Sequence, residues 1–379
     1  MENNIKIVTG KEEFEKIQKD WSEIVKKIHN RRFFQYYEWY ESYINALETN
    51  LESIFFVVLS NSVFTEAIIP LKKIRGVYFN ILELPDHNHL TLRDIIYPEC
   101  LQKKESIQKL MAHLMSSQKF KWDFIRLSCL LPDSCALNAF KNYSGTKIIR
   151  KLGACCYIPT QSYEKIKANL SKNMRIQLKT ILRKAKAIGE IQNRSYNTLS
   201  ELTKAYPVFL DLEPSGWKGI TGTRSAIKCN QDLIKFYNSL INRFSVYGES
   251  IIDILYIDER PISGQLGFII KDTYYLLKCG YDVSMSHISP GNLHRDFLLK
   301  KYAQKQNIKY FNLVSGKQIL WHSQWKASSL DTYEVIIFNK TLKGILAFAY
   351  MKTKEFIKPF YRSFIKPILK KISLLTFLI

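Results

Sequence analysis

The order in which strands and helices follow one another is the feature that most limits the fold of this chain. Hydrophobic periodicity predicts strand, two helices, three antiparallel strands, helix and strand over residues 5–129, and the same order again over residues 190–314. This order matches neither alternating βαβ units nor a run of strands alone. It therefore predicts an α+β protein built from two similar domains.

The individual elements are predicted from apolar spacing and turn residues. Phe14, Ile17 and Trp21 recur at helical spacing, for example, and the run 258–260 separates two strand-like segments as a hairpin turn would. In the first half the predicted strands are residues 5–8, 53–60, 64–71, 77–84 and 122–129, and the predicted helices are a stretch ending near 27, then 34–47, 106–117 and 134–143. In the second half the predicted strands are 190–195, 250–257, 261–270, 273–281, 309–314 and 333–338, and the predicted helices are 163–188, 198–212, 225–247 and one that begins near 290.

Length and composition agree with two domains. The chain has 379 residues, of which 46% are hydrophobic, and this is enough to fill two sizeable cores. We predict an N-terminal domain over residues 1–160, a second domain over residues 161–345, and a basic amphipathic tail over residues 346–379.

The charge balance is strongly basic. Lysine and arginine number 56 against 34 acidic residues, which gives a net charge of +22. Such a surplus favours an anionic partner, whether a nucleotide-bearing cofactor, a sugar nucleotide, RNA or a membrane surface. A general use of lysine for solubility explains the same surplus, so charge alone does not select a partner.

Cysteine spacing and the chain termini indicate a cytoplasmic protein. The seven cysteines include no CxxC pair, so neither a zinc site nor a disulfide framework is predicted. The N-terminal residues lack the apolar core of a signal peptide, and no apolar stretch reaches the roughly 18 to 20 residues that span a bilayer.

The last part of the chain, Phe356 to Ile379, has its own character. It carries five basic residues and no acidic one, and its phenylalanines and isoleucines recur four apart. This pattern is typical of a segment that lies on the inner face of an anionic membrane. Pro359 and Pro367 would interrupt a continuous helix, and packing on the domain or disorder is the competing interpretation.

A glycine-rich segment between two predicted helices is the most specific motif of the chain. It reads Leu-Glu-Pro-Ser-Gly-Trp-Lys-Gly-Ile-Thr-Gly-Thr over residues 212–223. Its glycines permit a tight backbone path beside a ligand, Trp217 can stack, and Lys218 supplies a point charge for phosphate or carboxylate. A plain loop packed under Trp217 is the alternative.

A second motif begins with Tyr281-Asp282 and continues with Ser-Pro-Gly-Asn-Leu at residues 289–293. Ser289 is predicted to cap a helix whose first position is Pro290. The unpaired amides of a helix start carry partial positive charge and suit a pyrophosphate. The next strand ends at Gly316-Lys317 and is followed by Trp325 and Lys326. An ordinary capped helix is the alternative.

The helix ahead of these motifs is rich in basic residues. Its apolar positions repeat from Leu170 to Ile188, and the other positions form a basic stripe: Lys172, Arg175, Lys179, Arg183 and Lys186. A solvated charged face is one interpretation of the stripe, and a surface for phosphate groups is the other.

Together these segments resemble the acyltransferases of the tandem GNAT type, the CelD-like (cellulose biosynthesis protein) and FemAB-like families. The resemblance covers residues 162–339 well and residues 21–98 more loosely. It implies two tandem GNAT domains, each a mixed, mostly antiparallel sheet flanked by helices. The glycine-rich Q/R-x-x-G-x-G/A loop of many GNAT enzymes is missing here, which leaves the donor open.

The function that the resemblance implies is an acyl-CoA-dependent N- or O-acyltransferase, with acetyl-CoA or another acyl-CoA as donor and no metal. Its acceptor would be a small molecule or a cell-envelope sugar or polysaccharide precursor. One alternative is a FemAB-like transferase that moves an aminoacyl group from tRNA to a peptidoglycan precursor, the only case in which nucleic acid is expected. Another is a non-catalytic scaffold at the membrane.

Roles follow for the residues of the motifs. Transfer needs a base for the acceptor proton and a group that polarises the thioester carbonyl. Asp282 and Glu213 are the candidate bases, Lys218 is the candidate polarising group, and a structural salt bridge is the alternative for each carboxylate. The predicted donor-binding residues are Trp217, Tyr281, Ser289, Pro290, Gly291, Asn292 and Leu293, and the predicted acceptor-binding residues are Lys317, Trp325, Lys326, His87 and His89.

The two histidines of the run 85–89 share a face if that run is extended. His87 and His89 lack a third ligand, so they are a weak zinc site and are predicted to be polar loop residues or to face the acceptor.

Overall fold

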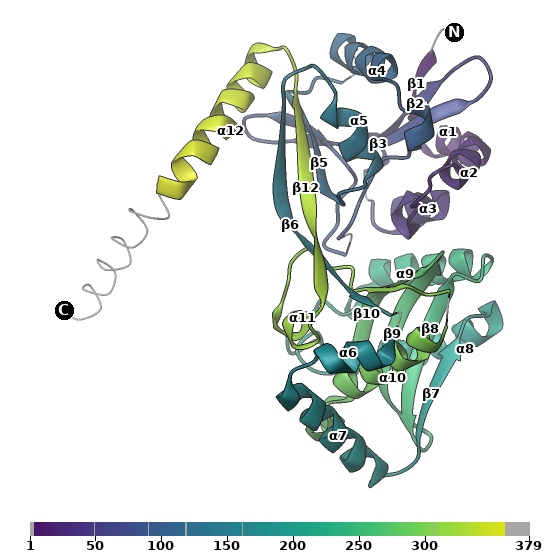
Figure 1. Ribbon diagram of the computed structural model, residues 1–379. Coiled ribbons are helices and arrows are strands. Elements are labelled where there is room, and N and C mark those ends of the chain that lie inside the picture. Colours follow the sequence, from purple (N-terminus) through teal and green to yellow (C-terminus); the bar gives the residue numbers. More distant parts are fainter. Residues whose placement is uncertain are drawn as a thin grey trace.

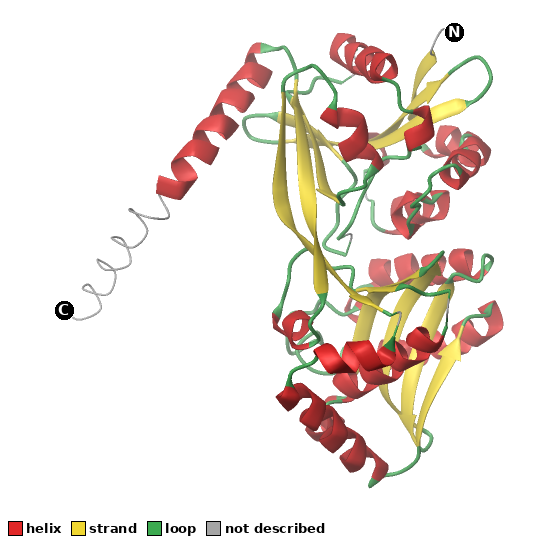
Figure 2. Ribbon diagram, in the orientation of Figure 1, coloured by secondary structure: helices red, strands yellow, loops and turns green. Residues whose placement is uncertain are grey.

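The computed structural model describes residues 4–360, except for Thr49, Leu90, Gln118, Lys119, Gln161 and Gln306, and except for the side chains of residues 356–360. Within these residues twelve strands form one sheet, in the order β1-β2-β3-β4-β5-β12-β6-β11-β10-β9-β8-β7 (Figure 1). Helices flank the sheet in both halves of the molecule (Figure 2). The predicted α+β class is confirmed.

The first half of the sheet is built by the N-terminal elements. They are β1 Asn4–Thr9, α1 Lys11–Lys16, α2 Gln18–Lys26, α3 Tyr37–Ala46, β2 Ile54–Ser60, β3 Thr65–Arg75, β4 Asn80–Glu83, α4 Lys104–Ser116, β5 Phe124–Leu130 and α5 Cys135–Lys141. Aromatic burial holds the helices on the sheet, since Phe14 and Trp21 place their rings 4.7 and 5.4 Å from that of Phe56.

The second half repeats this order. Its elements are α6 Tyr163–Asn169, α7 Lys172–Lys186, β7 Ile191–Tyr196, α8 Leu199–Leu212, α9 Gln231–Ser245, β8 Ser250–Ile257, β9 Arg260–Ile270, β10 Thr273–Tyr281, α10 Pro290–Gln304, β11 Tyr310–Asn312 and α11 Leu320–Gln324, followed by β12 Ser328–Phe338 and α12 Leu342–Phe360. The single helix predicted over 163–188 is wrong, because Ser171 starts a new helix by accepting a hydrogen bond from the Met174 amide at 3.2 Å.

One long strand was not predicted. β6, Lys147–Pro159, pairs with β12 along most of its length and with β11 at its end. β12 in turn lies between β6 and β5, so the last strand of the chain completes the first half of the sheet. These two strands join the halves into one sheet (Figure 1). The predicted boundary at residue 160 stays a prediction.

The second half places different helices on its two faces. On one face, Phe209 of α8 and Phe236 of α9 belong to the same buried cluster as Leu266 of β9. On the other, Ile181 of α7 and Leu293 of α10 pack with Ile262. The α8–α9 face also contacts the first half, where the ring of Phe33 lies 5.6 Å from Phe268 and 5.2 Å from Tyr275.

The described residues include no helix that is both long enough and apolar enough to cross a bilayer. The predicted membrane segment, residues 356–379, lies outside the described side chains.

Candidate active site

The candidate site lies where β10 and β11 part. The two strands pair in parallel over only three positions, from Thr273–Tyr310 to Tyr275–Asn312. β10 then shifts its register against β9 between Leu276 and Lys278. Such a bulge leaves backbone groups outside the regular ladder and redirects the following side chains, and bulges are frequent beside active sites.

The loop between α8 and α9 closes over this part of β10. Glu213, at the end of α8, is only 1% exposed, and its Oε2 accepts a hydrogen bond from the Ile227 amide at 2.6 Å. The close approach depends on Gly280, since a Cβ there would lie 2.4 Å from the Glu213 Cα. Lys218 Nζ donates to the Cys279 carbonyl at 2.7 Å and ties the loop to the strand.

Glu213 has the properties of a buried base. Its Oε1 is buried and has no hydrogen-bond partner among the described residues. Burial raises the pKa of Glu213, while the Ile227 amide, Lys218 and Lys278 act in the opposite direction. A carboxyl group with a raised pKa and a free oxygen can accept a proton near neutrality.

Lys278 is a residue of this cluster that sequence reasoning missed. Burial lowers its pKa to about 8, with Glu213 raising it and Lys218 lowering it. Its ammonium lies 5.7 Å from the centre of the Tyr237 ring on α9. A lysine inside the apolar run of β10 was the available signal, because a charge at a half-buried strand position needs a reason.

The first half contributes His89 to the same cluster. His89 Nδ1 lies 3.1 Å from the Tyr237 hydroxyl, and the His89 amide donates to His87 Nδ1 at 3.2 Å. Burial, with smaller contributions from the charge of Lys278 and its neighbours, lowers the pKa of His89 to about 3, so this imidazole is neutral near pH 7. The structure thus brings the predicted histidines near Tyr237 and Lys278, and Lys278 in turn feels the charge of Glu213.

Asp282, the other candidate base, is engaged elsewhere. Its Oδ1 accepts hydrogen bonds from the Ser284 amide at 2.9 Å and the Ser284 hydroxyl at 2.7 Å, and its Oδ2 accepts one from Arg260 at 2.5 Å. Burial raises the pKa of Asp282, but these bonds outweigh it and lower the pKa overall. An anion held in this way caps the turn at Val283–Ile288 and is a poor proton acceptor.

The start of α10 differs from the predicted serine cap. Ser289 adopts a left-handed conformation (φ 45°), and its side chain makes no capping hydrogen bond. Its carbonyl instead accepts from the Asn292 and Leu293 amides at 3.0 and 3.1 Å. Val314 and Lys326 also have positive φ. Four other described non-glycine residues with positive φ lie elsewhere in the fold, so these conformations do not by themselves mark the site.

The two predicted donor segments lie next to each other. Ser215 Oγ accepts a hydrogen bond from the Val283 amide at 2.9 Å, which joins the α8–α9 loop to the turn ahead of α10. Tyr281 contacts Gly291, whose added Cβ would lie 3.7 Å from its ring. Trp217 is 66% exposed at this place and is free to stack on a ligand.

The predicted acceptor residues after β11 divide into two groups. Trp325 is buried, and its indole Nε1 donates to Asn292 Oδ1 at 3.1 Å, so it packs α11 against the start of α10. Lys317 and Lys326 are exposed. Trp325 therefore supports the site and does not reach solvent.

Buried polar atoms gather on the α10 side of the sheet. Four of them have no hydrogen-bond partner among the described residues: Gln265 Oε1, Tyr274 Oη, His294 Nε2 and Arg295 Nε. Burial lowers the pKa of His294 to about 3 and that of Arg295 to about 10. Buried groups of this kind require water or a ligand group as partner.

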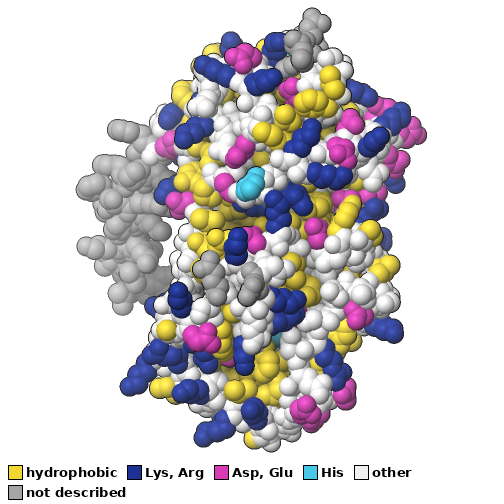
Figure 3. All heavy atoms as spheres, turned by 45° about the vertical axis from the view of Figure 1, so that its right-hand side comes forward, with side chains coloured by type: hydrophobic (Ala, Val, Ile, Leu, Met, Phe, Trp, Pro, Cys, Tyr) yellow, Lys and Arg dark blue, Asp and Glu magenta, His cyan; other side chains and the backbone are white. Residues whose placement is uncertain are grey.

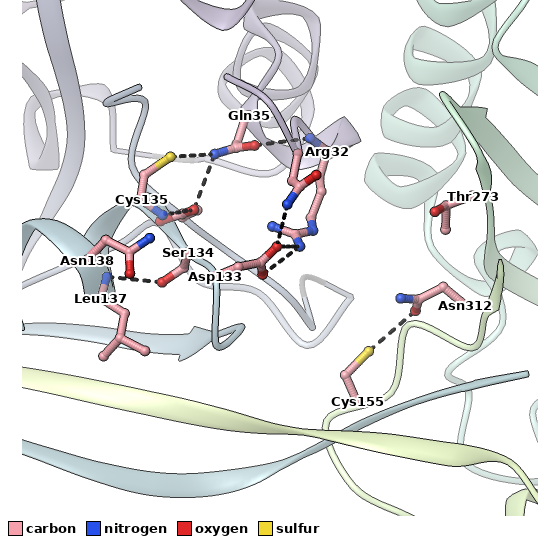
Figure 4. Close-up of polar contacts among 12 residues, drawn as sticks. Arg32, Gln35, Asp133, Ser134, Cys135, Leu137, Asn138, Cys155, Thr273 and Asn312 are labelled. Atoms are coloured by element: carbon pink, nitrogen blue, oxygen red, sulfur yellow. Dashed lines mark hydrogen bonds and ion pairs between the residues drawn. The ribbon is translucent and has the colours of Figure 1, made fainter. Parts of the chain in front are cut away.

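A separate cavity of about 380 Å³ lies between the two halves. Figure 4 shows Arg32 and Asp133 on one side of it and Thr273 and Asn312 on the other. Arg32 Nη2 donates to both oxygens of Asp133, at 2.7 and 2.8 Å. Thr273 is five residues from Lys278 on β10, which at about 3.3 Å per residue is roughly 16 Å away. Tyr275, which also lines the cavity, is three residues from Lys278, or roughly 10 Å along the strand, and the residues that line the cavity include neither Lys278 nor Glu213.

In the described part of the chain, no three His, Cys, Asp or Glu side chains are grouped so as to hold a metal ion. His87 and His89 have no third ligand there. All seven cysteines are free thiols.

Comparison with known proteins bears on the same part of the chain. Residues 172–327 match the acetyltransferase (GNAT) domain family. This segment contains Glu213, Lys218, Lys278 and the start of α10. No curated protein matches the chain significantly.

Several solved structures share the fold. The crystal structure of FemX aligns over 88% of this chain and 98% of its own, with a TM-score of 0.56 and 10% identity. The C-terminal domain of a candidate lysylphosphatidylglycerol synthetase from Agrobacterium fabrum aligns over 89% and 96%, with a TM-score of 0.51 and 9% identity. A protein of unknown function from Bacteroides thetaiotaomicron aligns over 85% and 97%, with a TM-score of 0.52 and 9% identity. Identities this low establish a common fold and nothing further.

Proposed function

We propose that the chain transfers an acyl group from acyl-CoA, most simply acetyl-CoA, to an amine or hydroxyl of a cell-envelope sugar or polysaccharide precursor, because residues 172–327 match the acetyltransferase (GNAT) domain family. The donor and the acceptor are the proposed parts of this statement. The acceptor class comes from the resemblance to CelD-like transferases, and the cavity between the halves offers room for a remote part of an extended acceptor.

One observation carries the proposal: Glu213, buried and with a free oxygen, lies with Lys278 and His89 where β10 leaves β11. The acceptor enters from the α8–α9 face, and its nucleophilic atom attacks the thioester carbonyl. Glu213 accepts the proton that the nucleophile loses, and the CoA thiolate is the leaving group. Backbone amides freed at the bulge of β10 polarise the carbonyl oxygen.

The donor phosphates are proposed to lie against the start of α10. Trp217 stacks from the α8–α9 loop, which the Ser215–Val283 hydrogen bond joins to the turn ahead of α10. The Asn292 and Leu293 amides already donate to the Ser289 carbonyl, so the positive end of the α10 dipole would attract the phosphates. Tyr281 contacts Gly291 between them. Lys317 and Lys326, both exposed, remain available for the anionic part of the acceptor.

The test begins with ligand stabilisation. The purified protein is heated with acetyl-CoA, longer acyl-CoA, free CoA or charged tRNA, since a ligand at free concentration L that binds only the folded state stabilises it by RT ln(1 + L/Kd) and so raises the melting temperature. Stabilisation by an acyl-CoA, followed by release of CoA thiol when candidate sugar acceptors are added, supports the proposal. No stabilisation by any CoA ester at millimolar concentration would refute the donor assignment.

A second candidate is a FemAB-like transferase that uses aminoacyl-tRNA and a peptidoglycan precursor. The observation that favours it is α7, which has six basic residues, no acidic one, and no ion pair among the described residues. Figure 3 shows basic side chains over both halves of the visible face. A gel shift with tRNA at 150 mM salt, weakening steeply as salt rises, would select this candidate. Thioester turnover would exclude a non-catalytic scaffold.

A further inference from the structure

The last described helix, α12, is apolar on two opposite faces. Its inner face packs on the sheet: Ala347 is fully buried, and the ring of Phe348 lies 5.2 Å from that of Phe338 on β12. Near its end, Glu355 accepts a hydrogen bond from Arg150 of β6 at 3.0 Å. The helix is therefore held at a defined orientation, and it extends away from the body of the molecule (Figure 1).

The outer face of α12 is exposed and apolar. Four large side chains lie on it at helical spacing and are more than half exposed: Leu342 75%, Ile345 56%, Leu346 54% and Tyr350 57%. Residues 349 and 353, which complete the same stripe, are Ala and Thr, and both are exposed. A helix that is apolar around most of its circumference is ordinarily buried, so this outer stripe requires a partner.

Lysines border the stripe on both sides. At 100° per residue, Lys343 and Lys354 project to one side of the outer face and Lys352 to the other, and all three are exposed. The only acidic residue of α12, Glu355, lies on the inner face with Arg150. An apolar stripe with cationic flanks is the pattern of a helix that lies in the interface of an anionic bilayer, with lysines reaching the head groups.

The size and charge of the stripe favour a membrane over a second copy of the chain. From Leu342 to Thr353 a helix rises about 17 Å, and a single stripe of that length covers much less than the roughly 800 Å² per partner that stable dimers bury. Two copies would also bring the same lysines together. The sequence after the helix, residues 361–379, contains four basic residues and no acidic one. Anionic lipid complements both the lysines that border the stripe and the basic residues that follow the helix.

We propose that the outer face of α12, residues 342–353, docks the protein on an anionic membrane surface, with Leu342, Ile345, Leu346 and Tyr350 inserted among the head groups. The inference is independent of the transferred group and of Glu213. It differs from the expectation for residues 356–379 in assigning the contact to the folded, anchored part of α12.

The experiment measures co-sedimentation of the full chain with vesicles of phosphatidylcholine containing 30% phosphatidylglycerol, and with phosphatidylcholine alone. Binding is expected only to the anionic vesicles and is expected to weaken between 0.1 and 0.5 M salt, where the screening length falls from about 10 Å to about 4 Å. The double variant Ile345→Glu/Leu346→Glu should lose at least about tenfold in partition, since burying each side chain is worth about 1.5–3 kcal/mol.

A matched control uses exposed apolar residues elsewhere. Val77 and Tyr78, in the turn between β3 and β4, are 93% and 78% exposed. Val77→Glu/Tyr78→Glu should bind vesicles as the unchanged protein does. As an independent probe, the single variant Tyr350→Trp should show added blue-shifted indole emission with anionic vesicles.

Three results would overturn the proposal. The first is vesicle binding that the Ile345→Glu/Leu346→Glu variant retains, because the contact would then lie in residues 361–379 alone. The second is equal binding to neutral and anionic vesicles. The third is a stable dimer in light scattering that this variant abolishes, without vesicle binding by the unchanged chain, which would identify a second copy as the occupant.

Discussion

Replacing Lys278 with methionine is predicted to stabilise the protein at neutral pH while it impairs transfer. Burial lowers the pKa of Lys278 from 10.5 to about 8. A shift of that size, at 1.36 kcal/mol per unit, corresponds to an upper bound of about 3 kcal/mol for keeping the ammonium charged inside the fold. Methionine has a similar length and no charge. The substitution also removes a cation beside Glu213, which offsets part of this stabilisation. The free energy of unfolding should therefore rise by about 1–2 kcal/mol at pH 7.

The dependence on pH follows from the two pKa values. The unfolded chain binds the Lys278 proton up to about pH 10.5, whereas the folded protein releases it near pH 8. The unfolded state therefore carries more protons in this window, and the stability of the unchanged protein rises with pH between 8 and 10.5 relative to that of the variant. The advantage of Lys278→Met should be full at pH 7 and should be lost by about pH 10.5.

The assay is urea unfolding followed by tryptophan fluorescence at pH 7 and at pH 10, with Lys204→Met on the exposed side of α8 as control. The control should change stability by less than about 0.5 kcal/mol. A Lys278→Met variant that is less stable than the unchanged protein at pH 7, or whose advantage does not change with pH, would refute the account of a strained buried ammonium. Such a result would mean that Lys278 is solvated.

Three further predictions concern the site and its support. Glu213→Gln should lower kcat by about 10²–10⁴-fold with little change in KM, measured by thiol release. The control Glu52→Gln, an exposed change in the first half, should leave kcat intact, and full turnover in Glu213→Gln would rule out this base. Gly280→Ala places a Cβ 2.4 Å from the Glu213 Cα and should reduce stability, while Gly291→Ala, whose nearest neighbour would be 3.7 Å away, should leave the urea midpoint unchanged. Equal urea midpoints for the two variants would contradict the packing argument. Ser171→Ala should cost about 1 kcal/mol by removing the cap of α7, and Ser171→Asp should preserve stability; an Ala variant with an unchanged midpoint would show that the cap contributes nothing.

Locally coded elements were predictable, because their signals lie in a few neighbouring residues. The three antiparallel strands β8, β9 and β10 were predicted within a residue or two, since their turns at 258–260 and 271–272 are short and polar. The start of α10 at Pro290 was predicted for the same reason. The glycine-rich loop at 212–223 could be singled out as unusual before any contact of Trp217 or Lys218 was known.

Strand β6 could not be found in this way. Its partners β11 and β12 are more than 150 residues away along the chain, and lysines and arginines break its apolar alternation. Arg150, for example, forms an ion pair at 2.7 Å with Glu334 of β12, and the local sequence does not predict this contact. Non-local pairing therefore turned a polar segment into the strand that joins the two halves.

The candidate site was also predictable from the sequence only in part. The types of residue in the motifs indicated phosphate binding and proton transfer, but they did not rank Asp282 against Glu213. The ranking came from contacts: Ser284 and Arg260 hold Asp282 as an anion, whereas α8 buries Glu213 and leaves one of its oxygens without a partner. Lys278 belongs to none of the sequence motifs, so the sequence did not indicate its place in the site.

By itself the sequence determined the α+β class and the order of most elements in each half, because turns, caps and periodicity act over a few residues, and the segments predicted to carry chemistry stay predictions. Only the tertiary structure decided that β12 completes the first half, that His89 meets Tyr237 across the halves, and that Glu213 is buried with a free oxygen while Asp282 is held by Ser284 and Arg260. The physical reason is that pKa values and strand pairing depend on what lies nearby in space, and burial supplies neighbours that the linear sequence leaves far apart.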